Sequence, residues 1–393
     1  MKRSESRILT THVGSLPRPR ELLQPLHAKD SGEPYDKPAL EAQIAKAIRD
    51  AVRQQVDLGL DIVNDGEHGR ASFATYANTR IGGLERVMHP PRHIGQPTRD
   101  SLAFPAVYEE MRKMFGARRV LTGRPEDAVS LVCTSPIRYI GQDEVKADIA
   151  NLKAATARLR PEEVFVTAIS PTNLEMYFAN QYYKTEEEYL FALAEAMREE
   201  YRAIVEAGFL LQIDDPRLIT HYNRDPNLSI EDNRRFIEMR VDVVNHSLAG
   251  IPEDRVRFHT CYSINVAPRV HDLELRHFVD LMLKVRAQGY SIEAANPRHE
   301  HEWRVWKEVR LPENKLLIPG VVSHCVYQVE HPELVADRIE RFAGVVGRER
   351  VIAGTDCGFA SARAGDEVHP DVAWAKLQAL VDGARIASKR LWS

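Results

Sequence analysis

Much of this chain alternates between short, nearly continuous apolar runs and longer segments in which apolar residues recur at helical spacing. The first pattern is typical of buried parallel β-strands, and the second is typical of amphipathic α-helices. Residues 38–59 show the helical pattern, with a proline near the start, a glycine at the end and apolar positions four apart at Leu40, Ile44, Ile48, Val52 and Val56. A strand-like run at 61–67 follows at once, so a helix and a strand alternate.

Eight strands are predicted from these runs, at residues 8–14, 61–67, 163–170, 209–215, 255–261, 290–294, 315–322 and 351–356. The segments around them favour helices at 144–159, 186–207, 230–249, 273–288, 332–346 and 373–389. Eight βα units over 393 residues indicate a (β/α)8 TIM barrel of the α/β class. A doubly wound sheet is the alternative, but no Gly-x-Gly-x-x-Gly motif follows the first strand.

The region of about residues 70–142 departs from this rhythm. Its arginines are scattered among glycine and proline without a period, and residues 131–140 have the pattern of a strand broken at Pro136. We therefore expect a single TIM-barrel catalytic domain over residues 1–393. An insertion between its second and third strands is expected to carry a β-hairpin, in the position of a lid.

Composition and charge narrow the function classes. The formal net charge of −4 implies no bulk attraction to nucleic acid or to an anionic membrane, so neither is an expected partner. No apolar run approaches the ~20 residues that span a bilayer, and no apolar signal-peptide segment follows the charged N-terminus. The four cysteines are too scattered for a disulfide framework, which favours a cytoplasmic protein with free or metal-bound thiols.

Metal-binding residue types gather at the ends of three predicted strands. Alternation places His259 and Cys261 on one face of a strand end, where an imidazole and a thiolate supply half of a tetrahedral zinc site. Glu293 and Cys357 end two later strands and are the candidates for the remaining ligands. The C-terminal strand ends of a barrel share one rim, so these four residues are predicted to bind Zn²⁺ together.

Glu293 has an alternative role, and a second histidine-rich segment has to be weighed as a metal site. Glu293 could instead form an ion pair with Arg298 or Arg304. The segment His299-Glu-His301-Glu resembles a metal cluster in composition. Its i, i+2 spacing puts the two histidines on different faces of a helix, however, so we expect a solvated face there.

Further polar side chains lie at or just after the ends of other predicted strands, at His12, Ser15, Glu67, Asp214 and Asp215. Two adjacent carboxylates at a strand end are costly unless a cation or an amine arrives, so Asp214 and Asp215 are predicted to contact the substrate. Capping of the following turn is the alternative. His12 and His324 are candidates for a general acid, or for partners that orient another site residue.

A series of motifs in this chain resembles the catalytic barrel of cobalamin-independent methionine synthase and its single-domain relatives. The resemblance covers most of the chain, and His-x-Cys with Asp-Cys-Gly is its most specific pair. The motifs are Thr11-His-Val-Gly-Ser-Leu-Pro17, Asp65-Gly-Glu67, Gln212-Ile-Asp-Asp-Pro216, His259-Thr-Cys-Tyr-Ser263, Ile292-Glu293, Pro319-Gly-Val321 and Asp356-Cys-Gly358.

The resemblance implies a function and a set of roles. It implies transfer of a methyl group to a zinc-bound thiolate, with a catalytic Zn²⁺ held by His259, Cys261, Glu293 and Cys357. It also implies that the amino-acid part of a thiol substrate such as homocysteine is held by Ser15, Glu67 and Asp214. The expected partners are therefore a small-molecule thiol and a methyl or alkyl donor.

The sequence also departs from the family pattern. Many relatives follow Pro-Gly-Val with Asp-x-His, whose histidine would protonate a folate leaving group, whereas this chain has Ser323-His-Cys325 there. Full-length members carry a second, N-terminal barrel, so both methylfolate and a methyl-carrier protein remain open as donors. One alternative is opening of an epoxide by a coenzyme M type thiol, with Arg18 or Arg217 binding the sulfonate. Another is a non-catalytic zinc-binding barrel.

Overall fold

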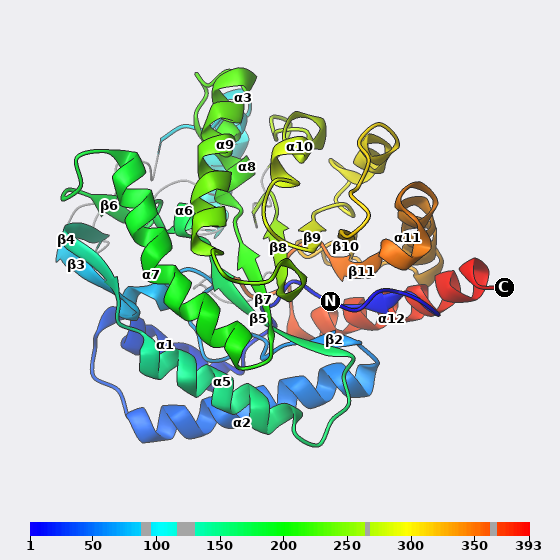
Figure 1. The fold of residues 1–393 in the computed structure, drawn as a ribbon, viewed down its shortest axis with the longest axis horizontal. Helices are drawn as coiled ribbons and strands as arrows, with labels where there is room; N and C mark the ends of the chain where they lie inside the picture. Colours follow the sequence, from blue (N-terminus) through cyan, green and yellow to red (C-terminus); the bar gives the residue numbers. More distant parts are fainter. Residues whose placement is uncertain (88–95, 116–129, 264–267, 362–367) are drawn as a thin grey trace.

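A computed structural model describes residues 1–87, 96–115, 130–263, 268–361 and 368–393 (Figure 1). Eight parallel strands form one sheet in the order β1-β11-β10-β9-β8-β7-β5-β2, so the strands from β2 to β11 lie side by side in chain order and β1 pairs with β11. The two strands at the ends of this order, β1 and β2, also approach each other, where the amide of Asp61 donates to the carbonyl of Thr10 over 3.2 Å. The predicted TIM barrel is thus confirmed. Its strands are β1 Leu9–Thr10, β2 Ile62–Val63, β5 Glu163–Ile169, β7 Leu210–Asp214, β8 Val256–Thr260, β9 Gly289–Ile292, β10 Leu316–Val322 and β11 Ile352–Thr355.

Helices surround the strands, which gather at the centre of Figure 1. The longer ones are α1 Arg20–Ser31, α2 Lys37–Leu58, α5 Gln142–Thr156, α7 Glu186–Glu206, α9 Ile230–Ser247, α11 Pro332–Val346 and α12 Pro370–Leu391. Helix α2 begins after Asp36, whose side chain accepts a bond from the amide of Ala39, and it ends at Gly59, which has a φ of 99°. Within the described ranges, no helix has the length and apolar character needed to cross a bilayer.

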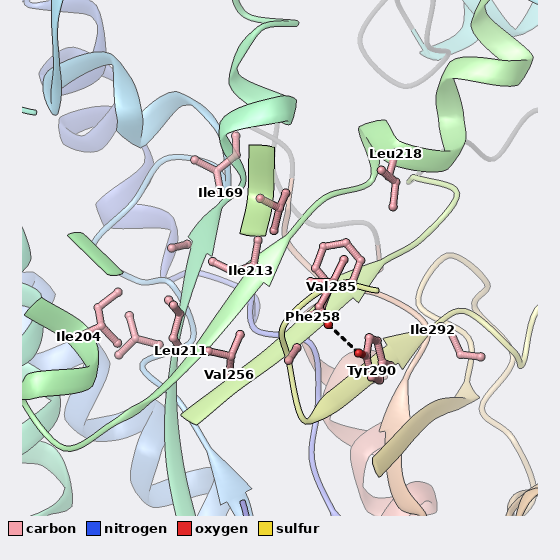
Figure 2. Close-up of a cluster of buried hydrophobic side chains, with 14 of the residues drawn as sticks. Ile169, Ile204, Leu211, Ile213, Leu218, Val256, Phe258, Val285, Tyr290 and Ile292 are labelled. Carbon is pink, nitrogen blue, oxygen red and sulfur yellow. Dashed lines mark hydrogen bonds between the residues drawn. The ribbon is translucent and has the colours of Figure 1, made fainter. Parts of the chain in front are cut away.

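Strand alternation sorts the side chains of the barrel into two sets. One set faces the helices and includes the β8 residues Val256 and Phe258 and the β9 residues Tyr290 and Ile292, all at most 5% exposed (Figure 2). The other set points into the barrel. Its lower part is an apolar cluster of Leu9, Ile62, Phe165, Leu210, Leu316, Ile318 and Ile352. Polar inward positions follow at the C-terminal ends of the same strands, which is where the predicted site lies.

The helix predicted at residues 273–288 is wrong over most of its length. The chain forms a short 3-10 turn at Leu275–His277, helix α10 at Val279–Met282 and then irregular backbone. The hydroxyl of Tyr290 donates to the carbonyls of Leu283 and Val285, and Asn245 binds both the carbonyl of Lys284 and the amide of Arg286. These side chains satisfy the backbone groups that a continued helix would have paired, and Figure 2 shows the bond between Tyr290 and Val285.

A second sheet contains β3 Ile81–Val87, β4 Ser130–Tyr139 and β6 Phe178–Asn180, in the order β3-β4-β6. Strand β4 runs through Pro136 without a break, and its antiparallel pairing with β3 shifts register between Gly82 and Leu84. Helices α3 Arg99–Ala103 and α4 Pro105–Phe115 lie between β3 and β4 in the chain. Residues 88–95 and 116–129 of this connection lie outside the described part, so the predicted insertion with its hairpin and lid stays a prediction.

Candidate metal centre and substrate site

His259 points into the barrel from β8 and is 2% exposed. Its Nδ1 lies 3.1 Å from the hydroxyl of Ser291, the residue paired with it on β9. Among the described residues its Nε2 has no nitrogen or oxygen partner, and the ring lies beside the Cys261 thiol. A histidine that is oriented through one ring nitrogen and uncommitted at the other is prepared to bind a metal ion.

Two thiols complete a compact cluster with this histidine. The sulfur atoms of Cys261 and Cys357 lie 3.3 Å apart, and one ring nitrogen of His259 lies with both sulfurs inside a group of atoms at most 4.8 Å from one another. Neither cysteine forms a disulfide within the described part of the chain. The hydrogen bond between the two thiols, helped by His259 and opposed by burial, holds the pKa of Cys261 well below its ordinary value. One imidazole and two thiolates are a donor set that zinc prefers, so these residues fit the predicted ion.

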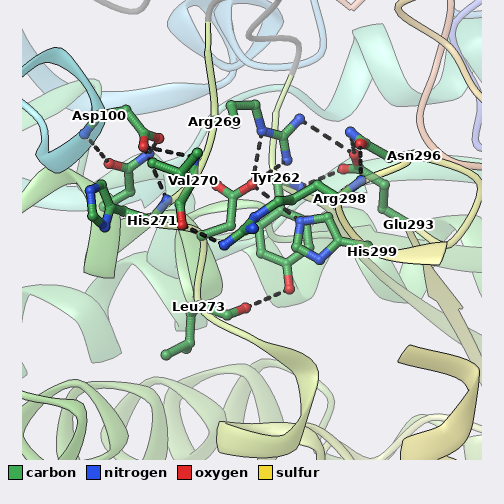
Figure 3. Close-up of polar contacts among 12 residues, drawn as sticks. Asp100, Tyr262, Arg269, Val270, His271, Leu273, Glu293, Asn296, Arg298 and His299 are labelled. Atoms are coloured by element: carbon green, nitrogen blue, oxygen red, sulfur yellow. Dashed lines mark hydrogen bonds and ion pairs between the residues drawn. The ribbon is translucent and has the colours of Figure 1, made fainter. Parts of the chain in front are cut away.

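Glu293, the fourth predicted ligand, follows β9 and is held differently. It is not part of the three-residue cluster. Its Oε2 accepts a bond from the amide of Tyr262 at 2.9 Å, and its Oε1 accepts one from the side chain of Asn296 at 2.8 Å (Figure 3). Arg269 Nη1 lies 3.4 Å from the same Oε1. The ion pair anticipated as the alternative for Glu293 is therefore present, but its cation is Arg269.

Asp356 connects the strand ends that carry Glu293 and Cys357. Its Oδ1 accepts bonds from the amides of Ala294 and Ala295 at 2.7 and 2.8 Å. Burial and the nearby Glu293 raise the pKa of Asp356 to about 8. A Cβ at Gly320 on β10 would lie 2.1 Å from this Oδ1, which explains why a glycine precedes Val321 here. The Asp-Cys-Gly and Pro-Gly-Val motifs thus meet in one contact.

Replacing Gly320 with alanine is expected to destabilise the fold by about 1–3 kcal/mol, because the added carbon displaces Asp356. Gly344, inside α11, is the matched control, since a Cβ there would meet no described atom within 4 Å apart from the backbone of its own helix. Its replacement with alanine is expected to raise stability by about 0.5–1 kcal/mol. Urea unfolding midpoints of both variants measure the difference, and equal midpoints would contradict the proposed contact.

Ser15 and Glu67 lie near the same rim on the loops that follow β1 and β2. The hydroxyl of Ser15 lies 3.0 Å from that of Ser361 and accepts a bond from the amide of Ala360 at 3.3 Å. Glu67 has a φ of 57°, and its Oε1 accepts a bond from Thr167 at 2.9 Å. Its Oε2 has no hydrogen-bond partner among the described residues and lies 3.7 Å from Arg18.

The two adjacent aspartates face different surroundings, as alternation requires. Asp214 points inward and accepts a bond from Gln212 at 2.7 Å. Burial raises its pKa to about 7, with His259 opposing and Glu67 adding to the shift, which places all three groups near one another. Asp215 instead accepts bonds from the hydroxyl of Thr172 and from the amide of Leu218, at the start of α8 Arg217–Arg224. The structure therefore brings Asp214 to the rim cluster and gives Asp215 the capping contacts.

The two candidate histidines are also separated. His324 is fully buried, and within the described part neither of its ring nitrogens has a hydrogen-bond partner. Burial lowers its pKa, while Glu293 and Cys261 act in the opposite direction, so His324 lies close to the metal-binding cluster. His12 bonds Gln55 at 2.8 Å through Nε2 and lies edge-on to Phe165, in the apolar lower part of the barrel.

The sequence did not predict the buried network of charged residues next to Glu293. His299 is 2% exposed, and its ring stacks on Tyr262 with centroids 3.8 Å apart (Figure 3). Although burial opposes protonation, bonds to Asp272 and Glu302 raise the pKa of His299 to about 9. The solvated face expected there was wrong for His299 and is correct for His301, which is exposed. The His299 to Glu302 spacing of three residues was the one local signal.

The fold and the cluster together define the class of this protein. It is a TIM barrel with a candidate metal centre, formed by a buried imidazole and two thiols at the C-terminal rim. The chain belongs to the family described as cobalamin-independent synthase, catalytic domain, whose sequence model matches residues 8–90 and 173–385. The resemblance predicted from the motifs is thus confirmed.

Individual relatives match nearly the whole chain. The chain is 25% identical over 389 residues to a methionine synthase of Thermococcus kodakarensis, covering 97% of this chain and 94% of that one. A methionine synthase of Pyrococcus furiosus is 23% identical, with 97% and 93% covered. Among solved structures, the B12-independent methionine synthase from Shewanella sp. W3-18-1 in complex with selenomethionine superimposes with a TM-score of 0.71 at 19% identity, covering 98% of this chain and 99% of that chain. This last likeness supports the fold.

Proposed function

We propose that this protein is a zinc-dependent S-methyltransferase that transfers a methyl group to a thiol such as homocysteine. The observation that carries the proposal is the cluster of His259, Cys261 and Cys357, whose ligand atoms lie within 4.8 Å of one another. Membership of the cobalamin-independent synthase family supports a methyltransferase, and the methionine synthases among its relatives support homocysteine as the acceptor.

The three clustered residues would hold the ion, and Glu293 is our proposed fourth, exchangeable ligand. Bound there, Zn²⁺ would keep the substrate thiol deprotonated at neutral pH, where a free thiol with a pKa of about 8.5 is mostly protonated. Ser291 orients His259, and Asp356 holds the backbone after Glu293. These contacts keep the donor atoms in place before substrate arrives.

The inward carboxylates and Ser15 are proposed to bind the amino-acid part of the substrate. The nearby Glu67 adds to the raised pKa of the buried Asp214, and an arriving ammonium group would relieve that repulsion. Ser15 offers a hydroxyl from the loop after β1. Asp215 is proposed to stabilise the start of α8 and not to contact the substrate, because its oxygens are engaged by Thr172 and Leu218.

Methyl transfer forms a carbon–sulfur bond and breaks the bond between the methyl carbon and its donor. The donor leaves with the electron pair, and a donor such as methylfolate must then take up a proton. We propose His324 as the residue that delivers it, because its ring is buried near the cluster and lacks a hydrogen-bond partner among the described residues. His12 is proposed to act at a distance, as a partner of Gln55 below the site.

Replacing His324 with glutamine is expected to lower kcat by about 100-fold or more, the usual contribution of a general acid. Zinc content is expected to stay at the wild-type level, because His324 is not one of the clustered donors. The exposed His301 provides a control, and its glutamine variant should keep the wild-type kcat. A His324 variant with unchanged kcat would remove this residue from the mechanism.

Product analysis tests the function directly. The zinc-loaded protein is incubated with homocysteine and either a ¹³C-methylfolate or a ¹³C-methyl corrinoid protein, and labelled methionine is measured by mass spectrometry. Methionine from either donor supports the proposal and identifies the donor. A thioether formed only from coenzyme M and an epoxide would instead establish the alkyltransferase alternative. That alternative is disfavoured by Arg18, which is engaged by the carbonyls of Glu67 and Ala360. No product from any combination would favour a non-catalytic barrel.

A further inference from the structure

Glu293 forms an ion pair with Arg269, a residue that is not part of the metal-binding cluster. The carboxylate is fully buried, and Arg269 lies 3.4 Å from its Oε1 with a side chain that is 6% exposed. The amide of Tyr262 binds its other oxygen, Oε2, over 2.9 Å. Glu293 is thus paired with a guanidinium while it lies outside the group of His259, Cys261 and Cys357.

Arg269 is itself fixed by the charged network behind it. Its Nε donates to Asp272 Oδ2 over 2.9 Å, and that same oxygen lies 3.1 Å from Nε2 of His299. His299 is bonded on its other side to Glu302. Its ring stacks on Tyr262, the residue that follows Cys261 (Figure 3). The guanidinium therefore has a defined position between two buried carboxylates, Asp272 and Glu293.

We propose that Arg269 is a positioning residue that competes with the metal ion for Glu293 and so keeps the fourth ligand exchangeable. This inference rests on the proposed zinc site. A carboxylate that binds Zn²⁺ must give up part of its bond to the guanidinium, and a carboxylate displaced by the substrate thiol has that bond to return to. Both states of Glu293 are then satisfied inside a buried site, where an unpaired carboxylate would be strongly disfavoured.

Two further contacts would hold the Glu293 carboxylate in its present position when the substrate thiol displaces it from the metal ion. The amide of Tyr262 and the side chain of Asn296 already bind its two oxygens. Catalytic zinc sites keep one position for substrate, whereas structural sites are closed by four protein ligands. In this protein Arg269 would keep the site of the catalytic kind. Among the described groups that contact the oxygens of Glu293, Arg269 is the cation, so without it the metal ion would be the only positive charge bound to this carboxylate.

Arg269→Gln is the direct test, and Arg298→Gln is its matched control. Arg298 belongs to the same cluster of loops in Figure 3 and carries the same charge, but its guanidinium binds the carbonyl of Val270. Zinc affinity is measured by competition with a chelator, and the ligand set is measured by X-ray absorption at the zinc edge with and without homocysteine. We expect Arg269→Gln to bind zinc about tenfold more tightly, as loss of one competing charged hydrogen bond implies. Its oxygen ligand should persist when thiol is added.

The outcomes separate the inference from the function. Wild-type protein that binds no zinc would overturn both. Wild-type protein that exchanges an oxygen ligand for sulfur, together with an Arg269→Gln variant of unchanged or weaker affinity, would overturn the inference alone. An equal gain in Arg298→Gln would also overturn it, because general charge would then be the cause.

Asp272→Asn gives an independent variant with the opposite sign, should the first one fail to fold. Asp272 shares Arg269 with Glu293, so removing its charge leaves the guanidinium to Glu293 alone. We expect zinc affinity to fall by about tenfold in this variant. Arg269→Lys retains a cation at this position, and we expect its affinity to lie between those of the wild type and Arg269→Gln. Tighter zinc binding in Asp272→Asn would contradict the competition.

Discussion

Replacing Cys261 with serine is expected to abolish stoichiometric zinc binding and, with it, the proposed methyl transfer. Cys261 contributes one of two thiols 3.3 Å apart, and its low pKa makes it available as a thiolate. A serine hydroxyl is not deprotonated in this way and is a poor zinc ligand. Loss of an outer partner of a metal ligand alone costs about 10–100-fold in affinity, so loss of a ligand should cost more. Metal analysis after dialysis measures the remaining zinc.

Cys133 provides the control for this experiment. It is buried as well, but its thiol bonds the carbonyl of Ser135 within β4, in the separate three-stranded sheet. Cys133→Ser is expected to retain one zinc per chain and wild-type activity. A Cys261→Ser variant that still holds one zinc per chain would show that the ion binds elsewhere.

Replacing Asp214 with asparagine is expected to lower kcat/KM for homocysteine by about 100-fold, because a charged hydrogen bond to the substrate ammonium group contributes up to about 3 kcal/mol. The carboxylate is 6% exposed and lies near Glu67 and His259, so its charge acts in a site with little water. Steady-state kinetics on the zinc-loaded variant measures the loss. Zinc content should remain at one per chain, because Asp214 is not one of the clustered donors.

A substrate without the amino group separates recognition from folding. With 4-mercaptobutanoate in place of homocysteine, wild type and Asp214→Asn should react at similar, low rates, because the contact under test is absent from both. A large loss with 4-mercaptobutanoate in Asp214→Asn would contradict the assigned role.

Asp215→Asn is expected to affect folding and not substrate binding. It removes the charged acceptor of the Leu218 amide and of Thr172, so it should lower thermal stability and leave KM for homocysteine near the wild-type value.

The fold was predictable because its signal is local. Each barrel strand is a short apolar run, and parallel strands in chain order leave few alternatives to a barrel. The error at residues 273–288 has a non-local cause. Apolar residues there recur as in a helix, but Asn245 of α9 and Tyr290 of β9 take over the backbone hydrogen bonds. No pattern within that segment reveals those partners.

The candidate site was likewise predictable in one part and not in another. Inward positions at strand ends follow from alternation, and His259, Cys261 and Cys357 do come together. The cation that pairs with Glu293 could not be identified, because Arg269 lies on a loop whose path depends on Asp272 and His299. Sequence distance suggested Arg298 or Arg304 instead. Which partner a buried carboxylate takes is decided by loop packing, and the strand pattern carries no information about that packing.

X-ray absorption at the zinc edge, with and without homocysteine, tests the central claim most directly. The account predicts one zinc per chain with two sulfur ligands and two nitrogen or oxygen ligands, matching Cys261, Cys357, His259 and Glu293. Addition of homocysteine should replace one oxygen by a third sulfur, since the substrate thiol takes the exchangeable position. A protein that binds no zinc, or a site whose ligands stay the same with every thiol, would contradict the account.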